Sequence, residues 1–238
     1  MHPHSPLYVV GAGSRLFQSL ALGLAFTAVS GRPEALAALP QFPPGAAILI
    51  FADPPDLHQT QALLLSLLDR VPVGAGCRVV YVSTISTTFG QSVVFPYEGP
   101  YAHKKRMAET VLASRTDLDL SIVRVGNVFD HGGWQAVRNR TRWAWLPAGY
   151  SSVFVSDAGL VRAAVNAGLQ AEPGHHVMNA WRVDPTAGIF RRVVAIPGLL
   201  SLYQLEWLRL PLKVAGRLLR VLKVYLPSHD DLNSFLAK

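Results

Sequence analysis

The chain of 238 residues has little cysteine and little charge. Its one cysteine, Cys77, excludes an internal disulfide and a cluster of thiolate metal ligands, and it is typical of a reducing compartment. Charged residues make up 16% of the sequence and hydrophobic residues 50%, which indicates a compact globule and not a disordered chain. We therefore expect a cytoplasmic protein in which Cys77 is a small buried apolar residue.

Apolar segments long enough to cross a membrane are also absent from the sequence. The first residues, 1–13, have neither the basic region nor the long apolar region of a signal peptide. Residues 16–29 are largely apolar, but this run is shorter than the roughly 20 residues that a bilayer requires. We expect neither secretion nor a membrane span.

Positive charge is present in excess, with 22 basic and 15 acidic residues and a net charge of +7. The excess is concentrated late in the chain, where residues 191–223 contain seven basic residues and one acid, Glu206. The leucine-rich tail spaces four of them by about one helical turn, which predicts a possible contact with an anionic membrane surface: Lys213, Arg217, Arg220 and Lys223. The alternative is a helix that buries its leucines against the protein body.

Short apolar runs alternate with helical patterns in the first part of the chain. The runs are typical of buried strands because they are rich in β-branched residues and end at turn residues: 7–10, 25–29, 46–51, 77–83 and 120–125. Residues 57–71 and 101–115 have apolar positions at helical spacing. This order predicts an α/β fold with a doubly wound, mostly parallel, Rossmann-like sheet over residues 1–130.

The pattern changes beyond about residue 130. Residues 131–150 are loop-like and rich in Trp and Arg, whereas residues 155–170 predict a helix that starts near Asp157. The tail over residues 199–226 is helical in pattern, and Pro211 would begin or kink a helix there. We expect residues 131–238 to form a smaller, mostly helical substrate-binding portion that partly completes the sheet.

Tyr101 and Lys105 are four residues apart on a predicted helix, so their side chains share one face. A tyrosine is a poor base at neutral pH because its pKa is about 10, but a neighbouring ammonium group favours the phenolate. A lysine placed in this way can make tyrosine a proton shuttle beside a nicotinamide cofactor. The alternative is an ordinary amphipathic helix.

The surrounding motifs resemble the extended short-chain dehydrogenase/reductase family of nucleotide-sugar epimerases and dehydratases. The likeness is strongest over residues 78–130, where "YVST", "FG", "PYAHKKRMAE" and "RVGNVFD" follow one another in the order of the family's motifs. It implies that Tyr101 is the catalytic acid/base, that Lys105 binds the nicotinamide ribose, and that Glu109 is the acidic position of the helix. The family's catalytic hydroxyl matches Thr84, with Ser86 as the alternative.

The resemblance also predicts a dinucleotide site near the start of the chain. Glycines should follow the first strand, but Ser14 and Phe17 stand where the family has its second and third glycine. An arginine and no acid follows the second strand, which favours NADP over NAD. Little sequence separates this strand from residue 46, so we expect a sheet shortened on that side. The predicted cofactor-binding residues are Gly11, Gly13, Ser14, Arg15, Arg32, Ala52, Tyr101 and Lys105.

The substrate residues implied by the resemblance lie later in the chain. Asn127 would approach the substrate, together with Ser86, and the arginine-rich loop containing Arg140 and Arg142 would bind a diphosphate. A solvated basic loop is the alternative for the arginines. No metal site is expected, since the histidines show no ligand spacing, and no nucleic-acid partner is expected.

These observations predict an NAD(P)-dependent oxidoreductase, epimerase or dehydratase acting on a nucleotide-linked sugar or a similar alcohol or ketone. The alternative is a catalytically inactive Rossmann-like protein that binds a nucleotide or a partner. The resemblance also implies a homodimer formed through helices like the one bearing Tyr101.

Overall fold

The computed structural model describes residues 5–85, 87, 100–128, 143–147, 152–185, 192–199, 202, 205–222 and 224–226. Contacts divide the chain into two compact units. The first unit comprises residues 1–84, 103–125 and 157–181, and the second comprises residues 85–102, 126–156 and 182–238. Each unit is therefore assembled from stretches that are separate in the sequence.

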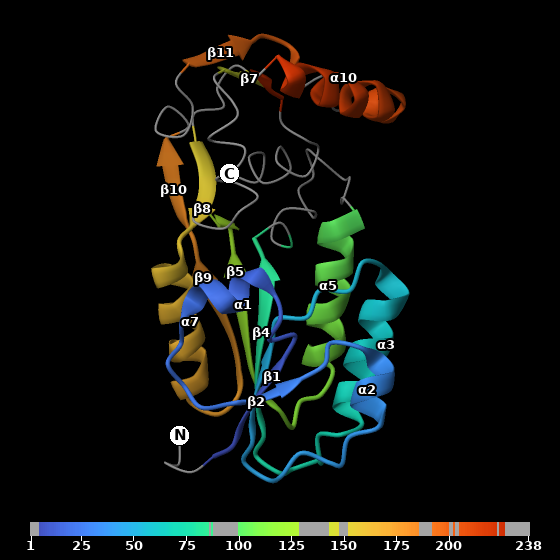
Figure 1. The fold of residues 1–238 in the computed structure, drawn as a ribbon, viewed down its shortest axis with the longest axis vertical. Helices are drawn as coiled ribbons and strands as arrows, with labels where there is room; N and C mark the ends of the chain where they lie inside the picture. Colours follow the sequence, from blue (N-terminus) through green and yellow to red (C-terminus); the bar gives the residue numbers. More distant parts are fainter. Residues whose placement is uncertain are drawn as a thin grey trace. The chain divides into compact units, whose positions relative to one another are not determined.

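A six-stranded sheet forms the centre of the first unit (Figure 1). Its strand order is β2-β1-β3-β4-β5-β9, and each neighbouring pair is parallel. The strands are β1 (Leu7–Val10), β2 (Thr27–Val29), β3 (Ala47–Ile50), β4 (Arg78–Thr84), β5 (Asp119–Val125) and β9 (His175–Ala180). This topology confirms the predicted doubly wound, Rossmann-like α/β fold.

The shortened side of the sheet is at β2, the outermost strand of the described sheet. After β2 the chain passes through the short helix α2 (Pro33–Ala37) and enters β3, which pairs with β1 on its other side. After only two strands, the third strand is therefore added on the other side of β1. This agrees with the short sequence between β2 and β3.

Helices cover both faces of this sheet (Figure 1). Helices α2, α3 (Leu57–Leu68) and α5 (Pro100–Ala113) lie over one face, and α1 (Arg15–Leu20) and α7 (Ala158–Gln170) lie over the other. Leu63, Leu64 and Leu67 of α3 and Leu112 of α5 are almost fully buried in one hydrophobic cluster. Each such leucine contributes about 2 kcal/mol through burial of apolar surface.

Aspartates begin two of these helices. The Asp56 side chain accepts a hydrogen bond from the backbone N–H of Gln59 at 2.8 Å, and Asp157 accepts one from Leu160 at 2.8 Å. These N-caps satisfy backbone donors that have no partner within the helix. The predicted helix start at Asp157 is thus confirmed.

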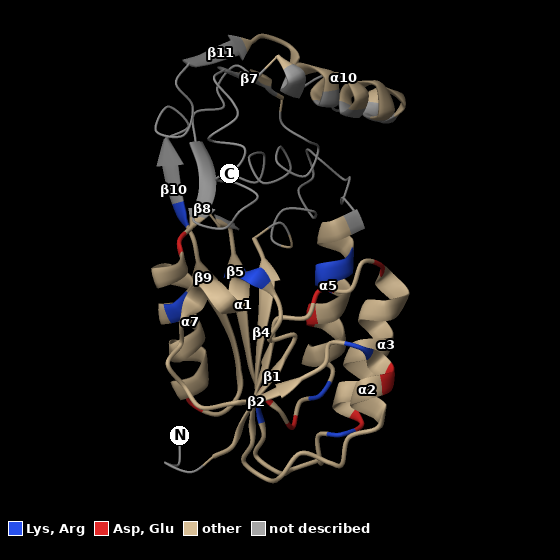
Figure 2. Cartoon of the chain, viewed as in Figure 1, with Lys and Arg blue, Asp and Glu red and all other residues tan. Residues whose placement is uncertain are grey.

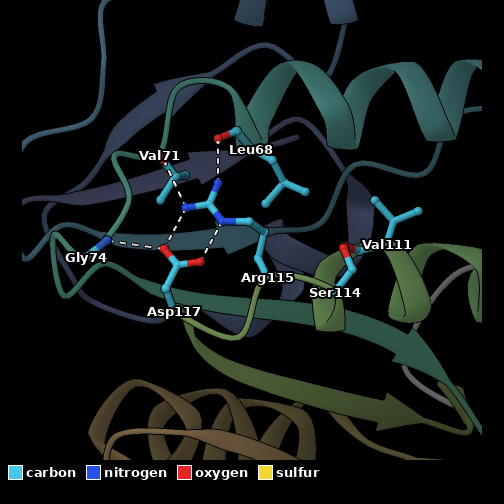
Figure 3. Close-up of polar contacts among 7 residues, drawn as sticks. All are labelled: Leu68, Val71, Gly74, Val111, Ser114, Arg115 and Asp117. Atoms are coloured by element: carbon cyan, nitrogen blue, oxygen red, sulfur yellow. Dashed lines mark hydrogen bonds and ion pairs between the residues drawn. The ribbon is translucent and has the colours of Figure 1, made fainter.

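An arginine and an aspartate that follow α5 make polar contacts with the chain that follows α3 (Figure 3). Arg115 Nε lies 2.7 Å from Asp117 Oδ1, and the guanidinium also donates to the carbonyl oxygens of Leu68 and Val71. Asp117 in turn accepts from the backbone N–H of Gly74 at 3.2 Å. The guanidinium holds the pKa of Asp117 well below its usual range. The pair connects the segment after α5 to the segment after α3.

The second unit contains two small sheets with the orders β10-β8-β6 and β11-β7-β12. Strand β7 lies in the stretch that the sequence predicts to be a loop, so that prediction is wrong for residues 143–147. Arginines just before this strand and tryptophans within it make the stretch resemble a loop in the sequence. The strands are β6 (Asn127–Val128), β7 (Trp143–Pro147), β8 (Ser152–Ser156), β10 (Arg182–Pro185), β11 (Arg192–Ile196) and β12 (Val224–Tyr225).

The tail of the second unit forms a 3₁₀ turn, η1 (Glu206–Leu208), and the helix α10 (Arg209–Val221). Pro211 lies in the first turn of α10, where its missing N–H costs no intrahelical hydrogen bond. This agrees with the expectation that the proline begins a helix. In the part of the chain that is described, no helix is long and apolar enough to cross a membrane.

Candidate functional site

A pocket of about 590 Å³ lies at the carboxyl ends of β1, β2 and β3. In doubly wound folds, ligands bind at this edge of the sheet where the strand order reverses. Twelve residues line the pocket: Gly11, Ala12, Gly13, Ser14, Ala28, Val29, Ser30, Gly31, Phe51, Ala52, Asp53 and Pro54. They include four of the predicted cofactor-binding residues.

Close backbone approach shapes this pocket. Gly11 has a φ of +83°, and a Cβ atom there would lie 2.5 Å from the backbone nitrogen of Ala52. A Cβ atom on Gly31 would lie 2.8 Å from the Cβ of Ala52. Only glycine fits both positions, because a side chain would collide with the end of β3. Gly11 and Ala52 are among the residues predicted from the sequence, whereas Gly31 is not.

The loop after β1 turns directly into α1. The Ser14 side chain accepts a hydrogen bond from the backbone N–H of Phe17 at 3.2 Å and so caps the helix. Gly13 has open space where a Cβ atom would be. Serine at the family's second glycine position is therefore compatible with the turn, since this residue caps the helix and has φ of −66°.

Phe17, at the family's third glycine position, does not line the pocket. Its side chain is buried and packs edge to face against Phe26 and Phe51, with ring centroids 5.1 and 5.2 Å away. The two partner rings come from the segments before β2 and after β3. Phe17 thus packs against other aromatic rings and stays out of the pocket lining.

The two arginines predicted to bind the cofactor lie beside the pocket and not in its lining. Arg32 directly follows Gly31 and is exposed, at the N-terminal boundary of α2. Arg15 directly follows Ser14 and is also exposed. Both side chains are therefore accessible to an anionic group.

Asp53 is the acidic residue of the pocket lining, and two lysines of α5 form ion pairs with it. Its Oδ1 lies 3.0 Å from Lys104 Nζ and 3.1 Å from Lys105 Nζ. Both lysines are about 5% exposed, whereas the Asp53 side chain is 41% exposed. The blue band on α5 in Figure 2 marks this basic stretch of the helix. Sequence reasoning missed Asp53 and Lys104, although they adjoin Ala52 and Lys105.

Lys105 also contacts strand β4. Its Nζ donates to the carbonyl oxygen of Val82 at 3.4 Å and lies 5.2 Å from the ring centroid of Tyr81. Burial lowers the pKa of Lys105, and the carboxylate of Asp53 only partly opposes this shift. Burial by itself would raise the pKa of Asp53, but the two ammonium groups hold it below its usual value. Each group thus favours the charged form of the other, while burial acts against both charges.

A second buried pair fixes α5 on the sheet. Glu109 Oε1 accepts a hydrogen bond from Ser83 Oγ at 2.6 Å, and Glu109 Oε2 accepts one from Arg124 at 2.7 Å. Ser83 belongs to β4 and Arg124 to β5, so Glu109 joins the helix to two strands. Glu109 therefore attaches to the sheet the side of α5 that also bears Lys105.

The remaining predicted site residues are placed only in part. Tyr101 lies in the first turn of α5, one turn before Lys105, and is 40% exposed. Thr84 is the last residue of β4 and is buried. Asn127 begins β6, but its side chain lies outside the described residues. Ser86, Arg140 and Arg142 also lie outside the described residues.

Comparison with known proteins gives a fold likeness without a sequence likeness. No family model and no curated protein matches the chain. A structure of MoeE5 with UDP-glucose and NAD is 14% identical, with a TM-score of 0.62, covering 95% of this chain and 86% of that one. RMD from Pseudomonas aeruginosa complexed with NADPH is 18% identical, with a TM-score of 0.54 and coverage of 82% and 87%.

A third similar structure is UDP-N-acetylglucosamine 4-epimerase from Bacillus cereus, 14% identical with a TM-score of 0.56, covering 82% of this chain and 89% of that one. These similarities extend over most of both chains. At such low identity they establish the fold alone. The chain therefore has the fold of the nucleotide-sugar epimerases and dehydratases that its central motifs resemble.

Proposed function

We propose that the protein is an NAD(P)-dependent enzyme that oxidises, reduces, epimerises or dehydrates a nucleotide-linked sugar. The observation that carries this proposal is the pocket built by Gly11, Gly31 and Ala52 at the carboxyl edge of a parallel sheet. Glycine there lets a pyrophosphate approach the backbone closely. The likeness to structures that contain NAD or NADPH supports the same choice of ligand.

The chain contributes binding groups around that pocket. The turn from Gly11 to Ser14 would face the pyrophosphate, and Arg32 would bind a 2′-phosphate, which favours NADP. When bound, the cofactor supplies the hydride acceptor or donor. Arg15 is accessible to the same anionic ligand.

Tyr101 would move the proton of the reacting hydroxyl, as its place on α5 one turn before Lys105 supports. Lys105 would orient the ribose while Asp53 holds the ammonium at the edge of the pocket. Thr84 would bind the reacting oxygen. For the substrate itself we propose Ser86, Asn127, Arg140 and Arg142.

A second candidate function is nucleotide binding without catalysis. The observation that favours it is the ion pair between Asp53 and Lys105, because the carboxylate neutralises an ammonium group that the catalytic proposal requires. In this case the pocket would bind the dinucleotide, and turnover would be absent.

Fluorescence titration of the purified protein with NADPH and with NADH distinguishes these functions. Tight binding supports the pocket, and Arg32→Gln should weaken NADPH about tenfold while changing NADH little. Turnover of nucleotide sugars that is lost in Tyr101→Phe, with binding retained, supports the enzyme. Binding without turnover would favour the second candidate, and no binding to either dinucleotide would overturn both.

A further inference from the structure

Large apolar side chains are exposed along α10 and beside its two ends. We call this set the α10 apolar face, and it comprises Trp207, Leu210, Val214, Leu218 and Leu222. These side chains are between 48% and 72% exposed. Positions 210, 214, 218 and 222 are four residues apart, so they follow one side of the helix. Contiguous exposed apolar surface of this kind marks an interaction site.

The α10 apolar face is not the side by which the helix packs within its own unit. Leu212, Ala215 and Leu219 lie on another side of α10 and are half-buried. The helix contacts β12, in which Val224 is buried, and Leu226 directly after this strand is buried too. Hence α10 has one apolar side for packing and a second one that faces outward.

Charge accompanies the α10 apolar face. Between residues 199 and 226 the sequence has five basic residues and a single acid, Glu206. Positions 213 and 217 each directly precede a member of the face, so the helical register places them along its edge. A surface that combines tryptophan and leucine with flanking Lys and Arg is complementary to an apolar layer under negatively charged head groups.

The same charges disfavour a second copy of this chain as the partner. A twofold contact would bring the same surface of each copy together, and with it ten basic residues from the two tails. Like charges that meet across an interface cost free energy and slow association. An anionic bilayer instead attracts each Lys and Arg near its surface.

We propose that the α10 apolar face binds the surface of an anionic phospholipid bilayer, with Trp207 and the leucines entering the boundary between head groups and acyl chains. Helix α10 has 13 residues and lies along the surface without crossing it. The proposed site uses residues of the second unit, whereas residues of the first unit line the dinucleotide pocket.

Co-sedimentation of the full chain with lipid vesicles tests this proposal. Vesicles of phosphatidylcholine with phosphatidylserine should sediment the protein, and vesicles of phosphatidylcholine alone should sediment much less. Added salt should weaken the binding, because it screens the attraction to the head groups. Equal binding to both vesicles, or no binding to either, would overturn the proposal.

Point variants separate this site from other apolar surfaces. Leu218→Gln should weaken binding about tenfold, because it removes most of one inserted side chain. The matched control is Leu65→Gln on α3, where the leucine is similarly exposed on a different helix and binding should not change. Lys213→Gln and Arg217→Gln should each weaken binding about fivefold. Circular dichroism and thermal unfolding verify that each variant is folded.

Two further outcomes would contradict the proposal. One is that Leu218→Gln and Leu65→Gln bind vesicles equally well. The other is that sedimentation velocity finds a dimer that Leu218→Gln dissociates while the vesicles bind neither form, which would identify a second copy as the occupant.

Discussion

The two parts of the candidate site are built by different means. The pocket beside Gly11, Gly31 and Ala52 is shaped by backbone atoms in close approach, and an added methyl group would collide with it. The region under α5 is built by charged side chains, in which Asp53 and Glu109 hold buried cations. The backbone part should therefore tolerate no enlargement, whereas the charged part should tolerate changes of size but not loss of a partner.

The largest effect should come from Gly11→Val. The new side chain would meet the backbone of Ala52 and would require a φ that β-branched residues avoid, so we expect the free energy of unfolding to fall by about 3 kcal/mol. Urea denaturation measures this loss. Gly13→Ala is the control, because open space surrounds that position. An equal loss in both variants would show that the close backbone approach at Gly11 has no special effect on stability.

Glu109→Gln should have the next largest effect. It removes the carboxylate that pairs with the largely buried Arg124, and we expect a loss of about 2 kcal/mol in the free energy of unfolding. In the double variant Glu109→Gln with Arg124→Gln, part of this loss should be recovered. Strictly additive losses in this double-mutant cycle would show that the two side chains are not coupled.

Asp53→Asn tests the charge at the pocket, and its effect should be smaller, about 1 kcal/mol, because Asp53 is partly exposed. The folded state holds the pKa of Asp53 below its usual value. Its contribution is therefore present above the unfolded pKa of about 4 and is lost as the pH falls through the lower folded pKa. Melting temperatures measured across acid pH should show a weaker pH dependence in Asp53→Asn than in the parent. Identical curves would contradict the ion pair.

The smallest effect should come from Asp117→Asn, which lies away from both parts of the site. The pKa of Asp117 is held well below its usual range by Arg115, so its contribution is also present above the unfolded pKa and is lost on acidification. We expect a slight fall in melting temperature at neutral pH and unchanged dinucleotide binding. Binding that weakens along with stability would show that this distant pair affects the pocket.

Patterns that are local in the sequence predict much of the first unit. Short runs of β-branched residues indicate the buried strands, and Asp157 indicates a helix start, because both features depend on residues close in the sequence. Gly11 and Ala52 could be nominated because each closely follows a strand that the sequence predicts. The partnership of Asp53 with Lys105 could not be found in this way, since its members are 52 positions apart and only the fold brings them together.

Two other features could not be predicted from local sequence patterns, for a similar reason. Gly31 resembles any turn glycine until the position of Ala52 is known. Phe17 departs from the family's glycine pattern, but its contacts with Phe26 and Phe51 involve the segments before β2 and after β3, which only the fold brings to α1. Which way a buried ring turns is decided by packing and not by the spacing of residues.

Because the sheet ends at β2, one wall of the pocket is also the margin of the sheet. A long ligand that extends past Ser30 and Gly31 would find no further strand of the described sheet beneath it. Its far end would lie over the segment that follows, in solvent, or against a molecule that covers this margin. This half of the ligand should therefore be recognised less strictly than the half over β1 and β3.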